Sequence, residues 1–352
     1  LNILAIAFAI TTFTSCSKDD NPIEPPVYEP TVYAVGGYDN SNGWNVAALW
    51  KNGVKTDLSN GTSEASAQDV FVVGSDVYVA GDVENSTGLS LATYWKNGVA
   101  TTLGSSSSLA NAIYVVGNDV YVAGEERNTL TSQTEPVLWK NGVKTSLLTA
   151  GSIYGQAFGV AVKNNTVYVV GYDHTSINVA KLWTINGTTV TSTTVSAPTM
   201  YGVAQDVKVS GNDVYVLWGE TNQTTAVDTI FYSKNSVATT VAASTSTTRT
   251  NGDAITISGN DVYIAGSDRD ANGVGRAKYW KNGVATYLTI SGGGDSDANG
   301  IGVFGNDVYF GGSNEVTSPT FYSHAYIAKN GTVTPLTTSA FEYGFVYDVE
   351  VQ

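Results

Sequence analysis

The chain has few of the side chains on which nucleophilic and histidine-based catalysis depends. Its 352 residues include one cysteine and two histidines, His174 and His324, and neither histidine lies in a recognisable motif. One cysteine cannot form an intrachain disulfide. No nucleophile elbow, P-loop or zinc-ligand spacing is present. A conventional catalytic centre is therefore not expected, although paired Asp or Glu side chains could still cleave a glycosidic bond.

Positive charge is also scarce. Lys and Arg number 17 against 31 Asp and Glu, and the formal net charge is -14. Such an acidic surface repels phosphate backbones, so nucleic acid is not an expected partner. Long helical patterns are missing as well, which favours an all-β protein.

One repeated unit dominates what is present. A VYxxG-type run recurs with its tyrosine at Tyr33, Tyr78, Tyr121, Tyr168, Tyr215, Tyr263 and Tyr309, in steps of 45, 43, 47, 47, 48 and 46 residues. In the copy at residues 111–148, four β-type runs are separated by a Gly-Asn-Asp turn, a polar loop and a Lys-Asn-Gly turn. A period of this length with four strands per unit is the mark of a β-propeller. The copies predict seven blades over residues 31–352.

The repeats begin and end out of phase. Residues 31–37 match the second strand of a blade, and residues 346–352 match a first strand. We expect the C-terminal strand to pair with the N-terminal one, so that one blade is built from three strands plus one. This pairing removes two exposed strand edges.

A tryptophan marks the end of the third run in five repeats. The position holds Trp50, Trp95, Trp139, Trp183 and Trp280, whereas the fifth and seventh repeats have Ser233 and Ala328. A tryptophan at a repeated position is either core between blades or a platform for sugars. We favour core, because burial of an indole removes a large apolar area from water.

The loops divide into two kinds. The turns after the first and third runs are short, whereas the loops after the second and fourth runs are long and varied. Because successive strands run in opposite directions, the short turns lie on one face of the disc and the long loops on the other. Function on a rigid scaffold usually resides in variable loops, so the long-loop face is the expected site. Acidic residues follow each VYxxG run and either keep these loops soluble or bind a cation or polyol; they are Asp39, Asp82, Glu125, Asp173, Glu220, Asp268 and Glu315.

A variable position occurs fourteen residues before each repeated tyrosine, near the expected mouth of the channel. It holds Glu64, Ser107, Tyr154, Tyr201, Arg249, Asp295 and, from the match of the last strand, Tyr343. Tyrosines beside acidic and basic groups can stack on sugar rings and bond hydroxyls. We predict a ligand-binding surface of Tyr154, Tyr201, Tyr343, Arg249, Glu64 and Asp295, with Trp44 and Trp218 added from outside the repeat register. The alternative is that the tyrosines only pack the loops.

Two stretches fit the pattern DxDxNG of a calcium loop, at residues 268–273 and 295–300. In the first, Asp268, Asp270 and Asn272 are the candidate ligands. The twelfth position, where a calcium loop carries a carboxylate, is Tyr279. A plain polar turn is the favoured interpretation, and a structural calcium is the only cofactor considered.

The N-terminal segment indicates export. Residues 1–15 are an apolar run too short to span a bilayer, followed by Cys16 and the sequence SKDDN. This arrangement resembles the signal of surface-exported lipoproteins of Bacteroidetes, in which the cysteine is lipidated; the alternative is a free cysteine in a plain secretory peptide. Residues 16–30 hold four of the eight prolines and form an extended linker. The run at residues 32–40 and the pair Gly311-Gly312 resemble kelch repeats, although the tryptophan stands elsewhere.

These features predict a seven-bladed propeller, monomeric and lipid-anchored in the outer membrane at the cell surface, which binds a glycan or a protein through its long-loop face. The alternative is a polysaccharide hydrolase or lyase that uses Asp and Glu on the same face. A third reading is a structural platform in an outer-membrane complex.

Cys16→Ala tests the anchor. The variant lacks the only site for lipidation, so we expect it in the soluble fraction, whereas the unchanged chain stays with membranes. Fractionation and immunoblotting measure this. A variant that remains in the membrane fraction contradicts the lipoprotein interpretation.

Overall fold

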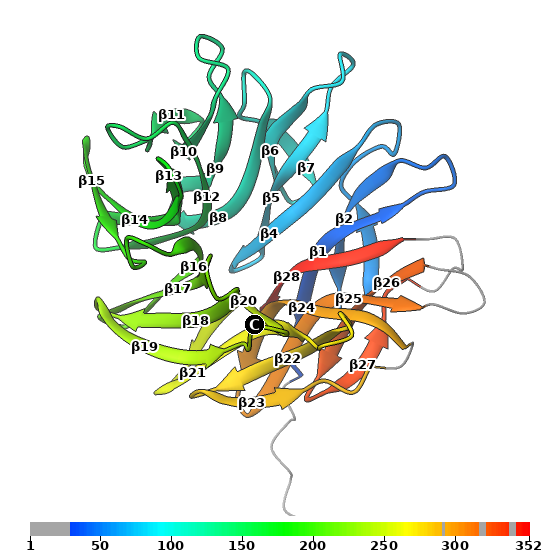
Figure 1. Ribbon diagram of the computed structural model, residues 1–352. Helices are drawn as coiled ribbons and strands as arrows, with labels where there is room; N and C mark the ends of the chain where they lie inside the picture. Colours follow the sequence, from blue (N-terminus) through cyan, green and yellow to red (C-terminus); the bar gives the residue numbers. More distant parts are fainter. Residues whose placement is uncertain (1–28, 291–292, 317–321, 338–342) are drawn as a thin grey trace, which may run out of the picture. The chain divides into compact units, whose positions relative to one another are not determined.

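Seven four-stranded antiparallel sheets stand in a ring in the computed structural model (Figure 1). The structure describes residues 29–290, 293–316, 322–337 and 343–352. The predicted signal segment 1–15, Cys16 and almost all of the linker 16–30 lie outside these residues. Among the residues described, no helix is long and apolar enough to cross a membrane. The all-β, seven-bladed propeller predicted from the repeats is confirmed.

Each blade consists of strands A to D, counted from the centre of the ring outwards. From blade 1 to blade 7, strand A is β28 (Gly344–Val351), β4 (Ala65–Val73), β8 (Ser108–Val116), β12 (Tyr154–Lys163), β16 (Tyr201–Ser210), β20 (Arg249–Ser258) and β24 (Gly293–Phe304). Strand B is β1 (Val32–Asp39), β5 (Asp76–Glu84), β9 (Asp119–Arg127), β13 (Thr166–His174), β17 (Asp213–Asn222), β21 (Asp261–Arg269) and β25 (Asp307–Val316). Strand C is β2 (Asn45–Lys51), β6 (Ser90–Lys96), β10 (Thr134–Lys140), β14 (Asn178–Asn186), β18 (Val227–Lys234), β22 (Gly275–Lys281) and β26 (Tyr322–Lys329). Strand D is β3 (Val54–Asp57), β7 (Val99–Thr102), β11 (Val143–Ser146), β15 (Thr189–Thr194), β19 (Val237–Ala243), β23 (Val284–Tyr287) and β27 (Thr332–Pro335).

Blade 1 joins the two ends of the ring. β28 pairs with β1 in antiparallel register from Val32 opposite Val351 to Tyr38 opposite Gly344. Thr31 and Gln352 extend this ladder with two further backbone hydrogen bonds of 2.7 and 3.0 Å. Each strand A also contacts strand A of the next blade, β28 with β4 included. The ladder pairs the inner edge of β1 with the outer edge of β28, as the out-of-phase repeats predict.

A β-bulge interrupts strand A in every blade. In β4, for example, the register shifts between Ala67 and Asp69, so Gln68 has no partner in β5. The same shift recurs in the other six inner strands. A bulge turns the extra side chain away from the regular alternation of the strand. The ring therefore presents one unpaired residue per blade to the central channel.

The five repeated tryptophans are core. Trp50, Trp95, Trp139, Trp183 and Trp280 are each at most 2% exposed. Each packs against the preceding blade; Trp183, for instance, lies in one cluster with Tyr121, Leu138 and Leu147 of blade 3. The indoles fill the gaps between sheets that diverge outwards, which explains their period.

One set of contacts, which we call the clasp, joins the short A–B turn of a blade to its short C–D turn. In blade 2, Lys96 Nζ lies 2.9 Å from Asp76 Oδ2 and 5.1 Å from the centre of the Tyr78 ring. Asn97 donates to Asp76 Oδ1 at 2.8 Å, and its own Oδ1 accepts the Val77 N–H at 2.9 Å. Asn97 holds a φ of 51°, which asparagine adopts more readily than most residues. The same clasp recurs in blades 3, 5, 6 and 7 and explains the repeated Asn-Asp and Lys-Asn pairs.

Trp139→Ala should lower the free energy of unfolding by about 3–5 kcal/mol, because it empties a buried inter-blade site. The matched control is Trp44→Ala, since the Trp44 side chain is 38% exposed and lies outside the tryptophan position. Denaturant unfolding of both variants measures the difference. Equal stability of the two variants would show that the repeated indoles are not the core of the ring.

Candidate functional site

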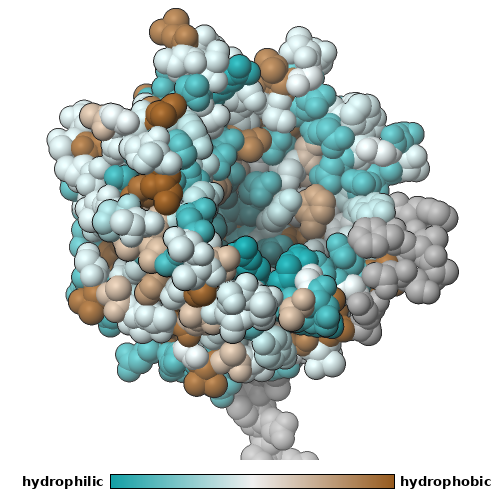
Figure 2. Space-filling model, viewed as in Figure 1, coloured by the Kyte–Doolittle hydropathy of each residue, from teal (hydrophilic) through white to brown (hydrophobic). Residues whose placement is uncertain are grey.

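The centre of the ring is hollowed, and the walls of the hollow are largely hydrophilic in surface view (Figure 2). A cavity of about 360 Å³ lies there, and strand A of every blade contributes to its lining. The lining starts at the bulges and continues to Val303 and Val351, close to the short A–B turns. The cavity thus occupies the half of the channel away from the long-loop face.

The bulge residues form the first ring of this cavity. Chemically they are amides, aromatics and one carboxyl: Gln68, Asn111, Phe158, Gln205, Asp253, Asn299 and Tyr347. A repeated backbone geometry therefore carries seven side chains of different chemistry. The channel differs in this respect from the short turns, where both the residue types and the backbone geometry repeat from blade to blade.

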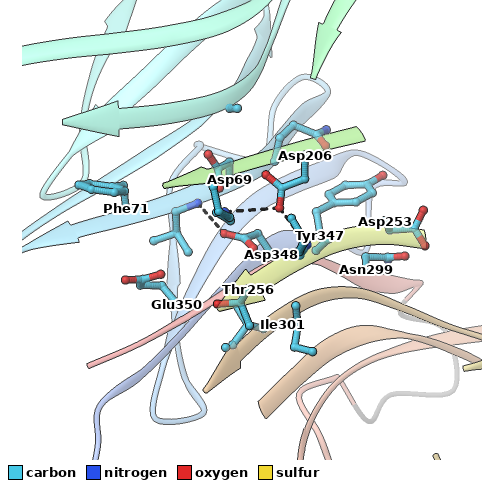
Figure 3. Close-up of a pocket in the computed structure, with 18 of the residues that line it drawn as sticks. Asp69, Phe71, Asp206, Asp253, Thr256, Asn299, Ile301, Tyr347, Asp348 and Glu350 are labelled. Atoms are coloured by element: carbon cyan, nitrogen blue, oxygen red, sulfur yellow. Dashed lines mark hydrogen bonds and ion pairs between the residues drawn. The ribbon is translucent and has the colours of Figure 1, made fainter. Parts of the chain in front are cut away.

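Three aspartates beside the bulges join neighbouring blades. Asp348 Oδ2 accepts the Val70 N–H at 3.2 Å, and Asp69 Oδ2 accepts the Ile113 N–H at 2.6 Å. Asp206 Oδ2 accepts the Ile255 N–H at 3.0 Å. Each carboxyl thus bonds the backbone of the next inner strand. Figure 3 shows the three side chains in the channel, where Asp348 and Asp69 come from the neighbouring blades 1 and 2 and Asp206 comes from blade 5.

Lys208 is the one basic residue in the cavity lining. Its ammonium lies 3.5 Å from Asp206 Oδ2, and its side chain is 42% accessible from the channel. Burial lowers the pKa of Lys208, but the charges of Asp206, Asp348, Asp69 and Glu350 outweigh it and raise the pKa overall. The lysine therefore stays charged among acidic groups on several blades.

Three acidic side chains of the cavity, Asp69, Asp253 and Glu350, have raised pKa values. Burial, followed by the charge of Asp348, raises the pKa of Asp69 well above its usual value. Burial raises the pKa of Glu350 to about 7, with a further contribution from Asp348 and an opposing one from Lys208. Burial also raises the pKa of Asp253 to about 7, although Asn251 donates to both of its oxygens at 2.9 and 2.7 Å.

A row of aromatic rings leads from the cavity to the long-loop face on blade 4. Phe158 lines the cavity, and its ring centre lies 6.1 Å from that of Tyr172. Tyr172 lies 6.4 Å from Tyr154 in an edge-on arrangement, and Tyr154 stacks on His174 at 4.3 Å and 10°. We call Tyr154, Tyr172, His174, Asn178 and Tyr201 the mouth patch.

Hydrogen bonds extend the mouth patch to blade 5. His174 Nδ1 lies 2.7 Å from Asn178 Oδ1, an acceptor, and therefore donates to it. Asn178 Nδ2 in turn donates to the Tyr201 hydroxyl at 2.8 Å. Two of the predicted binding residues, Tyr154 and Tyr201, are thereby linked. Glu125 lies beside Tyr172, and burial raises the pKa of this carboxyl to about 7.

The charged members of the predicted surface have partners within the ring. Glu64 Oε2 accepts the Asn45 N–H at 3.0 Å, and Arg249 lies 3.2 Å from Asp228 Oδ1. Asp295 accepts the Gly275 N–H at 2.9 Å and lies 2.7 Å from Arg269. In each case the partner Asn45, Asp228 or Gly275 belongs to the start of strand C in the preceding blade. The position at the start of strand A therefore links blades in these three cases, where it is charged.

The remaining predicted residues differ in exposure. Tyr343 and Trp44 are 39% and 38% exposed, whereas Trp218 is only 3% exposed and cannot serve as a surface platform. Trp44 lines a separate pocket of about 600 Å³ between blades 1 and 2, together with Asn60 and Asn85. Trp44 and Tyr343 stand next to strands of blade 1, whereas the mouth patch belongs to blades 4 and 5.

The calcium candidates make contacts typical of a polar turn. Asp270 Oδ1 accepts the backbone N–H groups of Asn272 and Val274 at 2.9 and 3.0 Å. Asp268 forms an ion pair with Lys278 and accepts a hydrogen bond from the Tyr287 hydroxyl at 2.8 Å. Among the described residues, no group of three or more His, Cys, Asp or Glu side chains is arranged to hold a metal ion.

The acidic residues after the VYxxG runs do not form one exposed ring. The offset from the repeated tyrosine is four residues for Asp82 but five for Asp173 and Glu220, so strand alternation places them on opposite sides of their blades. Asp82 and Asp173 are 8% and 1% exposed. Glu220 accepts the Ala197 N–H at 2.9 Å and the Trp218 indole N–H at 3.0 Å. These carboxyls mainly secure the loops.

The channel acids were missed by sequence reasoning, although the repeats contain a signal for them. The triplet x-Asp-Val occurs at residues 68–70, 205–207 and 347–349, and its aspartates are the three that join the blades. The other blades have Ala112, Gly159, Ala254 and Gly300 at that position. The triplet is visible in the aligned repeats, but the bulge that turns it inwards is not.

Comparison with protein families and with curated proteins finds no match. Among solved structures, the chain is similar to the acylaminoacyl peptidase of Pyrococcus horikoshii, with a TM-score of 0.51 and 10% identity over 90% of this chain and 52% of that chain. A puromycin-hydrolyzing peptidase of Mycobacterium tuberculosis gives a TM-score of 0.39 and 9% identity over 78% and 54%. The chain thus spans about half the length of these peptidases. The first likeness shows the propeller fold alone, and the resemblance to Bacteroidetes lipoproteins and kelch repeats rests on sequence motifs.

The channel acids predict that the protein loses stability between about pH 4 and pH 7. Unfolded, Asp and Glu release their protons near pH 4. In the folded protein Asp253 and Glu350 keep theirs to about pH 7, so the folded state binds more protons in this window and stability falls as the pH rises. Thermal midpoints from pH 4.5 to 7.5 measure the slope.

Asp253→Asn and Glu350→Gln together should reduce this slope, and the raised pKa values of Glu125 and Asp69 should leave the remainder. Asp119→Asn is the control, because Lys140 and Asn141 lower the pKa of Asp119 and its effect therefore lies below pH 4. A midpoint that rises from pH 4.5 to 7.5 in the unchanged protein contradicts the raised pKa values.

Proposed function

We propose that the protein is a cell-surface binding module that recognises a glycan through the mouth patch on its long-loop face. The observation that carries the proposal is the row of rings from Phe158 to Tyr154, joined to Tyr201 by the hydrogen bonds of His174 and Asn178. Aromatic rings flanked by amide, imidazole and hydroxyl groups offer both faces for stacking and partners for sugar hydroxyls.

Anchoring and assembly are part of the same proposal. Lipidation of Cys16 and the proline-rich linker 16–30 would hold a monomeric domain away from the outer membrane and leave its loops accessible. The support for this is the sequence of residues 1–30. A protein ligand is the alternative occupant of the same face.

A carboxylate-dependent hydrolase or lyase is the second candidate function. The specific observation in its favour is the raised pKa of Asp69 beside Asp348, because a protonated acid next to a second carboxyl is the equipment of glycoside hydrolysis. Against it, both carboxyls accept backbone N–H groups of neighbouring blades. The peptidases that share the fold add no catalytic residue to this chain, since the likeness concerns the fold. Release of reducing ends from a bound polysaccharide would favour this function over simple binding.

A glycan array probed with the purified chain, followed by titration of the best ligand, tests the proposal. Tyr154→Ala with Tyr201→Ala should weaken binding roughly tenfold or more, because each stacked ring contributes about 0.5–1.5 kcal/mol. Tyr287→Ala is the matched control, since Tyr287 is 56% exposed but belongs to strand D. The control should bind as the unchanged protein does. Equal affinity of all three proteins would remove the mouth patch as the binding site.

A further inference from the structure

The repeated tryptophan occupies a socket that is built from the same positions of the repeat in different blades. Trp183 of blade 4 packs on Tyr121, Leu138 and Leu147 of blade 3. Trp95 of blade 2 likewise packs with Tyr33, Leu49 and Leu58 of blade 1. The socket thus consists of the repeated tyrosine, the residue before the tryptophan position, and an aliphatic residue after strand D, all from the preceding blade.

Blade 7 lacks the tryptophan but fills its socket by other means. Ala328 stands at the tryptophan position, and Phe310 lies directly opposite it across β25 and β26. Phe310 is 0% exposed, and its ring centre lies 4.9 Å from that of Tyr279 in the socket of blade 6. A large ring from the neighbouring strand therefore replaces the indole.

Blade 5 also lacks the tryptophan, and its replacement fills the socket only in part. Ser233 stands at the position, and the residue opposite it is Val216. Trp218, two residues further along the strand, is 3% exposed and stacks on Phe231 at 5.2 Å. Its indole lies in the cluster that includes Tyr168, Leu182 and Val195, and it lines the space that remains.

A cavity of about 480 Å³ lies at this place between blades 4 and 5. Its lining includes Tyr168, Leu182 and Val195, which are the socket residues of blade 4, and Val214, Val216 and Ser233 of blade 5. These residues come from the sheets β12–β15 and β16–β19 or directly follow β15, and the two sheets are neighbours in Figure 1. The cavity is the part of the tryptophan socket that neither Ser233 nor Trp218 fills.

Tyr168, which lines this cavity, is less buried than the other repeated tyrosines. Six of the seven repeated tyrosines are buried, at 4–6% exposure, and Tyr168 alone is only partly buried. It also lacks the lysine that covers the other six rings, because its cross-strand neighbour is Thr184. The face of one aromatic ring is therefore accessible from the cavity.

We propose that this socket binds a small planar aromatic molecule of about the size of an indole. Its walls are those that pack an indole in other blades, so the same shape and apolar area are available to a ligand. An apolar cavity of about 150 Å³ in an engineered protein core takes up benzene, which shows that such sites bind free rings. Thr193, Thr194, Asn235 and Ser236 also line the cavity and offer polar partners to a substituent on the ring.

Indole itself is the probe, and the purified full chain is the protein. Ligand-observed NMR and the thermal midpoint at rising indole concentration measure binding, since a ligand of the folded state raises the midpoint. We expect indole to bind the unchanged chain and glucose not to compete for the socket. Ser233→Trp restores the side chain of the other blades, so we expect at least tenfold weaker indole binding and a higher midpoint without ligand.

Val216→Phe copies the arrangement of Phe310 in blade 7 and should also block indole; it decides the matter if Ser233→Trp does not fold. Tyr154→Ala with Tyr201→Ala should bind indole as well as the unchanged chain does, which separates this site from the mouth patch. The proposal is overturned if indole does not bind up to its solubility limit. Equal indole binding by the unchanged chain and the folded filling variants overturns it too.

Discussion

The packing of one large ring between neighbouring blades is the interaction on which the rest of the structure depends. Sheets arranged around an axis diverge outwards, and the gap between them must be filled to keep water out. Five blades fill it with the repeated tryptophan, and blade 7 does so with Phe310. This packing fixes the position of the inner strand A of each blade. The bulge residue of strand A can then differ in chemical type from blade to blade without disturbing the ring. The constant part of the repeat builds the ring, and the variable part lines the channel.

The channel and the long-loop face are connected in this arrangement. Asp69, Asp206 and Asp348 contribute to the joining of the blades and at the same time make the cavity acidic, with Lys208 as the one basic group lining it. On blade 4 the rings of Phe158, Tyr172 and Tyr154 lead from this cavity to the surface. A ligand at the mouth would therefore meet aromatic rings before it met the buried acids. This order favours recognition at the rim over chemistry in the channel.

The fold could be predicted closely from the sequence because the residues that repeat are those that pack between the blades. The tyrosine period, the tryptophan position and the out-of-phase ends were enough for seven blades and the pairing of β28 with β1. The site was less accessible. Tyr154 and Tyr201 were predicted from the variability of their position, and Asn178 connects them in the structure. Glu64, Arg249 and Asp295 at the same position instead bond the preceding blade. All five residues stand four positions before the bulge residue of their strand, so the repeat register does not separate them; the bonding partner in the preceding blade does, and periodicity does not reveal that partner.

Closure of the ring by the last strand is the central claim, and hydrogen exchange tests it most directly. Exchange rates of the backbone amides of Phe345 and Glu350 in β28 should be compared with that of Val122 in the middle of blade 3. Thr31 and Gln352 exchange two hydrogen bonds, so antiparallel alternation places Glu350 in a bonded pair with Tyr33. The bond from the Asp39 N–H to the Tyr343 carbonyl likewise places Phe345 in a bonded pair with Gly37. The account predicts that their protection equals that of Val122, because all exchange only on global opening. Exchange of β28 at the rate of a fraying terminus, with Val122 still protected, would contradict it.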